Sequence, residues 1–258
     1  MRDFTIEIYK KLLHELQQAG YTFVSFAEYL SGSAKGAKTL ILRHDVDRKP
    51  KRSLETAKLE KEMGIRGTYY FRVRKNEIPE EEIGKIAALG HEIGYHYEDL
   101  EAGGGDIGKA VESFKKNLAR LRKLVPVKTV CMHGSPRSKH DNRLLWERYD
   151  YRDFNIIGEP YFDIDFSKVF YLSDTGRRWD GEAFSIRDKV RGPTELYAKL
   201  HSTRDIIAAL EKDLLSDKIM LTVHPQRWND GFLLWLKELV WQNIKNLVKY
   251  FVAKGGST

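Results

Sequence analysis

The amino-acid sequence predicts an α/β protein built from parallel strand–helix units. Strand-like and helix-like segments alternate along most of the 258 residues, which is the pattern of such units. Apolar residues make up 41% of the chain, enough to fill the core of one large domain. No internal repeat, long linker or low-complexity stretch divides the sequence. We therefore expect a single domain over residues 1–258.

Periodicity predicts the individual elements. Apolar and β-branched runs predict strands over residues 21–26, 39–42, 68–73, 92–96, 127–132, 169–172 and 218–223. Apolar positions three or four residues apart predict helices over residues 5–18, 51–63, 80–89, 106–124, 203–214 and 232–251. In the last of these helices, we expect Trp235, Leu239, Ile244 and Val248 to anchor a wide apolar face in the core.

Composition excludes several classes of protein. The net charge is +7, but lysine and arginine alternate with glutamate along the predicted helices, and no nucleic-acid-binding module is recognisable. We therefore expect no nucleic-acid partner. Cys131 is the only cysteine, which excludes an internal disulfide and a cysteine-rich zinc site. There is no run of 18 apolar residues and no signal-peptide pattern, so we expect a cytoplasmic protein without a membrane span.

The stretch from Leu42 to Asp47 carries most of the functional information. A buried strand over residues 39–42 leads directly into His44, Asp45 and Asp47. Strand alternation places the two aspartates on one face and His44 on the other. Burying a carboxylate is costly unless it is paired or bound to a metal, so the pair predicts a reaction site or a metal site. The structural alternative is an ion pair with a neighbouring arginine, Arg43 or Arg48.

Three histidines also end predicted strands. His96 ends the strand at 92–96, His133 follows the strand at 127–132, and His224 follows the strand at 218–223. In a β/α barrel the carboxyl ends of the strands line one mouth, so these imidazoles are expected to meet the two aspartates there. The other histidines that we considered lie on helices or loops and are left out of the site: His14, His140 and His201.

Imidazole and carboxylate are the usual ligands of a divalent metal of the zinc type. Such a metal polarises a carbonyl group and makes a bound water nucleophilic near neutral pH. A second carboxylate can then accept the proton of the water, and a remaining histidine can donate one to the leaving group. This set of groups predicts hydrolysis of an amide or an ester.

Three stretches resemble ordered motifs of the polysaccharide deacetylases of carbohydrate esterase family 4. They are Leu-Arg-His-Asp-Val-Asp at 42–47, Gly-His-Glu-Ile-Gly-Tyr-His at 90–96 and Leu-Thr-Val-His-Pro at 221–225. The similarity runs from about residue 39 to residue 225. It implies a distorted (β/α)7 barrel, here with an extra N-terminal helix. It also implies metal-dependent removal of an acetyl group from an N-acetylated sugar or polysaccharide precursor.

The resemblance also implies roles for individual residues. By position, Asp45 resembles the catalytic base of the family, His96 the first histidine of its metal-binding His-x-x-x-His, and His224 its general acid. Trp179 resembles the tryptophan that packs beside this acid. We assign Trp179 and its neighbour Arg178 to substrate binding.

The sequence departs from the family pattern at the metal ligands. Val46 stands where the family has its second aspartate, Leu100 where it has its second metal histidine, and residues 132–136 where it has an arginine-rich motif. From the geometry of the strand ends, we infer that Asp47 and His133 replace the missing ligands beside His96. A site that has lost its metal is the alternative, and either aspartate could be the base.

The expected activity is hydrolysis of a carbon–nitrogen bond in a small-molecule or oligosaccharide substrate, with intracellular glycan precursors favoured because no export signal is present. Two alternatives stay open. The first is an inactive carbohydrate-binding barrel in which the aromatic residues Tyr161, Phe162 and Trp228 stack on sugar rings. The second is an amidohydrolase that acts on a non-sugar substrate whose phosphate or carboxylate is bound by Arg177, Arg178 and Arg227.

Overall fold

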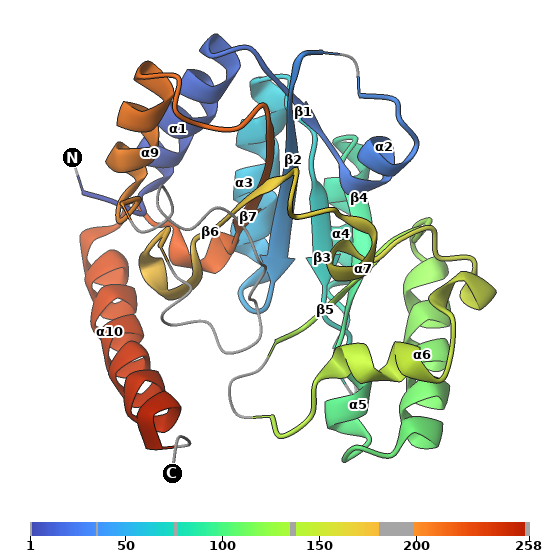
Figure 1. The fold of residues 1–258 in the computed structure, drawn as a ribbon. Coiled ribbons are helices and arrows are strands. Elements are labelled where there is room, and N and C mark those ends of the chain that lie inside the picture. The colour runs from blue at the N-terminus through green and yellow to red at the C-terminus, as the bar shows by residue number, and fades with distance from the viewer. Residues whose placement is uncertain (1, 35, 75–76, 135–137, 181–198, 256–258) are drawn as a thin grey trace.

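A seven-stranded parallel sheet forms the centre of the molecule (Figure 1). The computed structural model describes residues 2–34, 36–74, 77–134, 138–180 and 199–255, with side chains described up to residue 246. The strands are β1 Tyr21–Val24, β2 Lys38–Val46, β3 Thr68–Phe71, β4 Glu92–Tyr97, β5 Val130–Met132, β6 Phe170–Ser173 and β7 Lys218–Val223. Their order is β5-β4-β3-β2-β7-β6, and β1 pairs with the first half of β2.

The sheet curls into the distorted (β/α)7 barrel that the sequence predicts. Cys131 of the edge strand β5 and Tyr171 of the other edge strand β6 belong to one buried cluster with Ile41, Tyr70 and Met220. Side chains from both edges of the sheet therefore meet inside it. The two edge strands are not hydrogen-bonded to each other in the described chain, so the barrel is open between them.

Helices cover the outside of the sheet. The extra N-terminal helix, α1 Ile6–Gln18, packs with α9 Thr203–Glu211 on the outer side of β2 and β7, in a cluster that includes Leu12, Leu42 and Leu221. A second outer cluster joins β3, β4 and β5 to three helices, α3 Pro50–Glu62, α4 Glu80–Ala88 and α6 Ile107–Arg122. The short helix α2 Phe26–Leu30 closes the amino-terminal end of the barrel, where the backbone N–H of Phe26 donates to Thr68 Oγ1.

The remaining elements are short, and all but one lie between β4 and β7. They are α5 Asp99–Ala102, η1 Asn142–Glu147, η2 Tyr151–Phe154, α7 Pro160–Asp163, η3 Thr175–Arg177 and, after β7, η5 Pro225–Arg227. The turn at α7 fills part of the open edge, because the backbone N–H of Met132 in β5 donates to Glu159 Oε1 at 2.9 Å.

Strand β2 is longer than the sequence predicts. It continues past Leu42 to Val46, so Arg43, His44 and Asp45 are part of the strand. The strand tolerates these charged groups because each is paired. Arg43 binds Asp45 inside the barrel, and His44 Nε2 lies 2.8 Å from Glu60 Oε1 outside it. As the alternation predicts, His44 faces away from the aspartates.

The C-terminal helix α10, Phe232–Gly255, forms where the sequence predicts, but its packing differs. The side chain of Ile244 is half exposed, and Trp235 and Leu239 are only partly buried. The expectation that Ile244 anchors the core is therefore wrong; Val248 lies outside the described side chains. Polar Gln242 and Asn246 take the buried positions instead. None of the helices in the described ranges has the length and apolar content needed to cross a bilayer.

Candidate active site

Strand alternation brings the predicted site residues to one end of the barrel. Asp45 near the end of β2 and His96 in β4 face the interior. The next residues after β2, β5 and β7 are Asp47, His133 and His224. Parallel strands end at the same rim, so five groups from four strands lie together. The structure thus gathers the two aspartates and three histidines that the sequence singles out.

Asp47 lies at the centre of this group. Its Oδ1 is 3.6 Å from His96 Nε2 and 3.5 Å from His133 Nε2, and its Oδ2 is 4.0 Å from His224 Nε2. Asp47, His96 and His133 each offer a ligand atom, and these atoms lie within 4.8 Å of one another. Asp47 Oδ1 is buried and has no hydrogen-bond partner among the described residues. A buried carboxylate oxygen without a donor is what a bound cation would satisfy, so these residues fit a metal.

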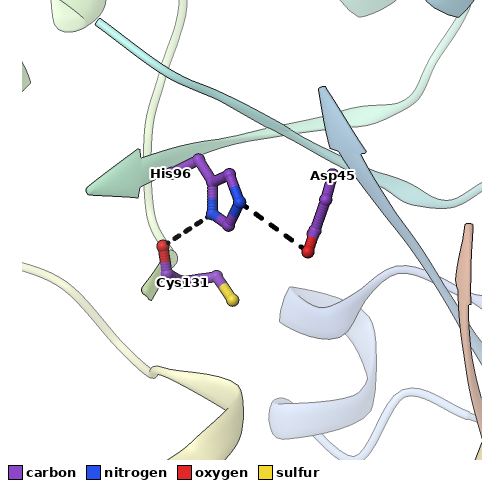
Figure 2. A group of neighbouring side chains, drawn as sticks. All are labelled: Asp45, His96 and Cys131. Atoms are coloured by element: carbon purple, nitrogen blue, oxygen red, sulfur yellow. Dashed lines mark hydrogen bonds and ion pairs between the residues drawn. The ribbon is translucent and has the colours of Figure 1, made fainter. Parts of the chain in front are cut away.

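The Nδ1 atoms of His96 and His133 contact protein groups on the side away from Asp47. His96 Nδ1 lies 3.0 Å from the carbonyl oxygen of Cys131, as Figure 2 shows, and His133 Nδ1 lies 3.1 Å from Glu98 Oε2. Glu98 is in turn bound by the guanidinium of Arg72. In metal sites a histidine commonly donates one N–H to a carbonyl or carboxylate and ligates through its other nitrogen. The contact of His96 Nδ1 with the Cys131 carbonyl leaves Nε2 of that ring facing Asp47. His133 Nε2 also faces Asp47, although its Nδ1 has only an ion-pair contact with Glu98 and no hydrogen bond among the described residues.

Charge states in the site also suit a metal. Burial lowers the pKa of His96 to about 4, although nearby Asp45 opposes this, so the ring is neutral at pH 7. Burial alone would raise the pKa of Asp47, but the neighbouring His133, His224 and His96 outweigh it and lower the value to about 2. A neutral imidazole, as in His96, and an ionised carboxylate, as in Asp47, are the protonation states that ligate a metal.

Asp45 is held differently from Asp47. Arg43 Nε and Nη2 donate to Oδ1 and Oδ2 of Asp45 at 2.8 and 2.7 Å, and both side chains are buried. The ion pair considered as a structural alternative therefore exists for Asp45, through Arg43. Burial would raise the pKa of Asp45, but the charge of Arg43 outweighs it and keeps the pKa low. Asp45 Oδ2 lies 3.7 Å from His96 Nε2, so the fixed carboxylate borders the metal ligands (Figure 2).

His224 is paired with a carboxylate that sequence reasoning missed. Its Nδ1 lies 2.5 Å from Asp174 Oδ1, and its backbone N–H donates to Asp174 Oδ2 at 2.9 Å. Arg227 Nη1 and Trp228 Nε1 also donate to Asp174, which is fully buried. This arrangement holds the ring so that Nε2 faces Asp47. Asp174 directly follows β6, so the strand-end criterion that found the other residues would have found it too.

Gln226 is a second residue that the sequence did not indicate. It lies in the turn η5 after His224, and its Nε2 donates to Asp47 Oδ2 at 3.4 Å. Its Oε1 is buried without a hydrogen-bond partner among the described residues. The amide therefore helps to position the central carboxylate, while its oxygen stays available to a donor in the site.

Gly94 lets the ring of Tyr70 pack closely against β4, in the barrel interior below the site. A Cβ atom added to Gly94 would lie 2.3 Å from the ring of Tyr70 in the neighbouring strand β3. The Tyr70 ring fills the interior two residues below His96, and its hydroxyl lies 3.1 Å from Thr129 Oγ1. The Gly-x-His spacing at 94–96 is thus explained by packing, because only glycine leaves room for this ring.

The assignment of Trp179 to substrate binding needs correction. Trp179 is fully buried and donates from Nε1 to Thr203 Oγ1 at 3.0 Å. It packs 6.0 Å from Trp228, the tryptophan that binds Asp174, so it lies near the acid as the resemblance implies. A buried indole cannot contact a ligand, however. Arg178 donates to Asp180 at 2.8 and 2.6 Å, and its Nη2 lies 2.9 Å from His201 Nδ1. Its assignment to substrate binding stays a prediction.

Comparison with known protein families finds no matching family model, and no curated protein matches. Several solved structures have a similar fold. A family 4 carbohydrate esterase from Streptococcus mutans has a TM-score of 0.47 and 12% identity, over 92% of this chain and 90% of that one. A family 4 pseudoenzyme from Bacillus anthracis has a TM-score of 0.45 and 12% identity over 81% of this chain, which spans only 61% of the pseudoenzyme.

A family 4 acetyl xylan esterase from Clostridium thermocellum, in complex with a cobalt ion, has a TM-score of 0.40 and 16% identity, over 84% of this chain and 91% of that one. Likenesses at these TM-scores and identities assign no activity to this chain. All three neighbours are described as members of carbohydrate esterase family 4.

Proposed function

We propose that this protein is a metal-dependent hydrolase that removes an acetyl group from an N-acetylated sugar or polysaccharide precursor. The observation that supports it best is the group formed by Asp47, His96 and His133, in which the buried Asp47 Oδ1 has no donor among the described residues. The sugar component of the proposal comes from the motif resemblance. The hydrolytic component comes from the set of groups around Asp47.

The donor set, two imidazole nitrogens and one carboxylate, suits zinc or a similar divalent ion. When bound, such an ion supplies a Lewis acid for the acetyl carbonyl and lowers the pKa of water. Three protein ligands leave positions for water and substrate, which is the pattern of catalytic rather than structural sites.

Asp45 is suited to accept the proton of the attacking water. Its carboxylate is ionised, is fixed by Arg43 and borders the ligand His96 at 3.7 Å. Asp47 is less suited to this role, because its Oδ1 faces His96 and His133. The sequence leaves open which aspartate is the base. We assign this role to Asp45.

His224 is suited to protonate the leaving nitrogen. Its Nδ1 is held by Asp174, so Nε2 is the atom that exchanges protons on the side of Asp47. The Asp174 carboxylate keeps the ring oriented and stabilises it when protonated, as a buried carboxylate does for a catalytic histidine. Base and acid therefore lie on different strands, β2 and after β7, at the same mouth.

The two alternative functions receive less support. Trp228, one of the aromatics expected to stack on sugars, is buried and bound to Asp174. The three arginines expected to bind an anionic group are engaged within the protein. Arg178 pairs with Asp180, Arg227 with Asp174, and Arg177 lies over the ring of Phe4.

The test combines metal analysis with acetate release. Purified protein should contain about one equivalent of a zinc-type ion and should release acetate from an N-acetylated sugar oligomer. Asp47→Ala and His96→Ala should each lose the metal, whereas Asp165→Ala, at an exposed aspartate of another loop, should retain it. Full metal retention in both site variants would rule out this ligand set. Metal binding without acetate release would support the metal site but would reject an acetylated sugar as the substrate.

A further inference from the structure

The helix α10 carries an apolar face that no described part of the chain covers. It runs along one side of the barrel (red in Figure 1) and packs against the turn η3. Of the eleven large apolar side chains that are exposed in the described residues, seven lie in this helix, with exposed fractions from 38% to 78%. They are Phe232, Leu233, Leu234, Leu236, Val240, Trp241 and Ile244. Contiguous exposed apolar surface of this kind marks an interaction site.

The side of α10 that faces the protein buries the polar residues Gln242 and Asn246 beside Trp235 and Leu239, which are partly buried. Gln242 Nε2 donates to Asn246 Oδ1 at 2.8 Å, and Asn246 Nδ2 donates to the carbonyl oxygen of Gly176 at 3.0 Å. Glu238, the one acidic residue of the helix, lies 3.8 Å from Lys49. Surface helices normally bury their apolar side chains, whereas α10 leaves seven large ones exposed. These polar contacts fix the helix with its apolar side turned outward.

Cationic and aromatic residues border the apolar face. At about 100° per residue, Leu233, Val240 and Ile244 fall within about 40° of one another at its centre, and Phe232 and Trp241 mark borders about 180° apart. Arg2 lies over the Phe232 ring at 5.4 Å, and Lys245 lies over the Trp241 ring at 5.9 Å. Each border therefore combines an aromatic ring with a positive charge.

We propose that α10 lies flat on a membrane surface that contains anionic lipids. Aliphatic side chains at the centre of the face would enter the boundary between headgroups and acyl chains, with the aromatic rings at headgroup level. The cations at both borders would then contact lipid phosphates. The helix itself carries four lysines and a single glutamate, which matches a negatively charged surface.

A second copy of the chain is the other candidate for this face, and Lys237 argues against it. Lys237 falls within the apolar arc, about 40° from Leu233, and is exposed. In a paired face it would be buried without a counter-charge, because Glu238 is turned inward to Lys49. Burial of an unpaired ammonium group is costly. At a membrane the same side chain reaches the phosphates with its flexible stem.

The experiment is co-sedimentation of the full chain with vesicles. We expect binding to vesicles of phosphatidylcholine mixed with phosphatidylglycerol, weak binding to phosphatidylcholine alone, and a decrease as salt is added. Val240→Glu, at the centre of the face, should lower the partition coefficient at least tenfold. The matched control is Leu214→Glu, which adds the same charge at another exposed leucine and should bind like wild type.

Other outcomes would overturn the proposal. Absence of wild-type binding to the anionic vesicles would do so, and so would equal binding by wild type and Val240→Glu. Sedimentation equilibrium tests the second copy: a wild-type dimer that Val240→Glu converts to monomer, together with no vesicle binding, would assign the face to self-association. Since position 240 is exposed, an unchanged thermal unfolding curve should show that Val240→Glu is folded.

Discussion

Arg43 binds both carboxylate oxygens of Asp45, the residue two positions farther along the same strand. Asp47, two positions farther again, has no arginine partner in the described chain, and its Oδ1 has no donor there. One strand end therefore presents two aspartates in different states. Asp45 is already neutralised by a cation of the protein, whereas Asp47 faces two imidazole nitrogens and keeps one oxygen without a donor among the described residues.

This difference predicts that the two aspartates fail in different ways when changed. Asp47→Asn removes a ligand, so we expect the affinity for a zinc-type ion to fall at least 100-fold and activity to fall with it. Asp45→Asn removes the proposed base but no ligand, so we expect metal affinity within about tenfold of wild type and a loss of kcat of about 10²-fold or more. Competition with a chelator measures the affinity, and acetate release measures kcat.

The comparison between these two variants is the control, because both make the same chemical change on the same strand. Equal loss of metal in both would show that Asp45 is itself a ligand. Wild-type metal affinity in Asp47→Asn would show that the ion, if it binds, is held elsewhere.

Arg43 should set the pH at which the base becomes active. Its charge holds the pKa of Asp45 low against the opposing effect of burial. In Arg43→Gln that pKa should rise, and because the base must be ionised, the acidic limb of the kcat profile should move to higher pH. The variant also leaves a buried carboxylate unpaired, at a cost of about 3–5 kcal/mol in unfolding free energy. Arg43→Lys, which keeps the charge, should show smaller changes, and an unshifted acidic limb in Arg43→Gln would remove Asp45 from the role of base.

Asp174 should matter only when the leaving group needs a proton. Asp174→Asn removes the carboxylate that orients His224, so we expect kcat on an N-acetylated sugar to fall about 10²-fold or more. Hydrolysis of an activated aryl acetate, whose leaving group departs without protonation, should fall much less. Similar losses on both substrates would show that Asp174 supports the fold of the site rather than the proton donor.

The positions of the central residues follow from local patterns, as does that of Asp174 directly after β6, whereas the position of Gln226 does not. Alternation along a strand, and the meeting of parallel strand ends at one rim, are enough to predict that Asp45, Asp47, His96, His133 and His224 converge. Gln226 depends on the course of a turn after β7, which the sequence does not specify.

Burial was harder to predict than secondary structure. Trp179 lies near the acid, but it is fully buried between Trp228 and Thr203, the first residue of α9, so proximity does not give contact with substrate. For α10, periodicity predicts a helix correctly. It cannot tell which side faces the protein, because that depends on contacts with residues far away in sequence, such as Asn246 with the Gly176 carbonyl and Trp235 with the Asp3 carbonyl.

Glu159, at the open edge of the barrel, should make stability fall as pH rises. Burial raises its pKa from 4.5 to about 7, although the backbone N–H groups of Met132 and Tyr161 oppose this. Between these values the folded state binds a proton that the unfolded state lacks, so the contribution of Glu159 is full below pH 4.5 and is lost as pH rises through about 7. Relative to Glu159→Gln, wild type should lose on the order of 1 kcal/mol of unfolding free energy per pH unit between about pH 5 and 7. Urea unfolding at several pH values measures this difference, and Glu147→Gln, at an exposed glutamate, is the control. A difference between wild type and Glu159→Gln that does not change with pH would show that the carboxyl group is ionised throughout.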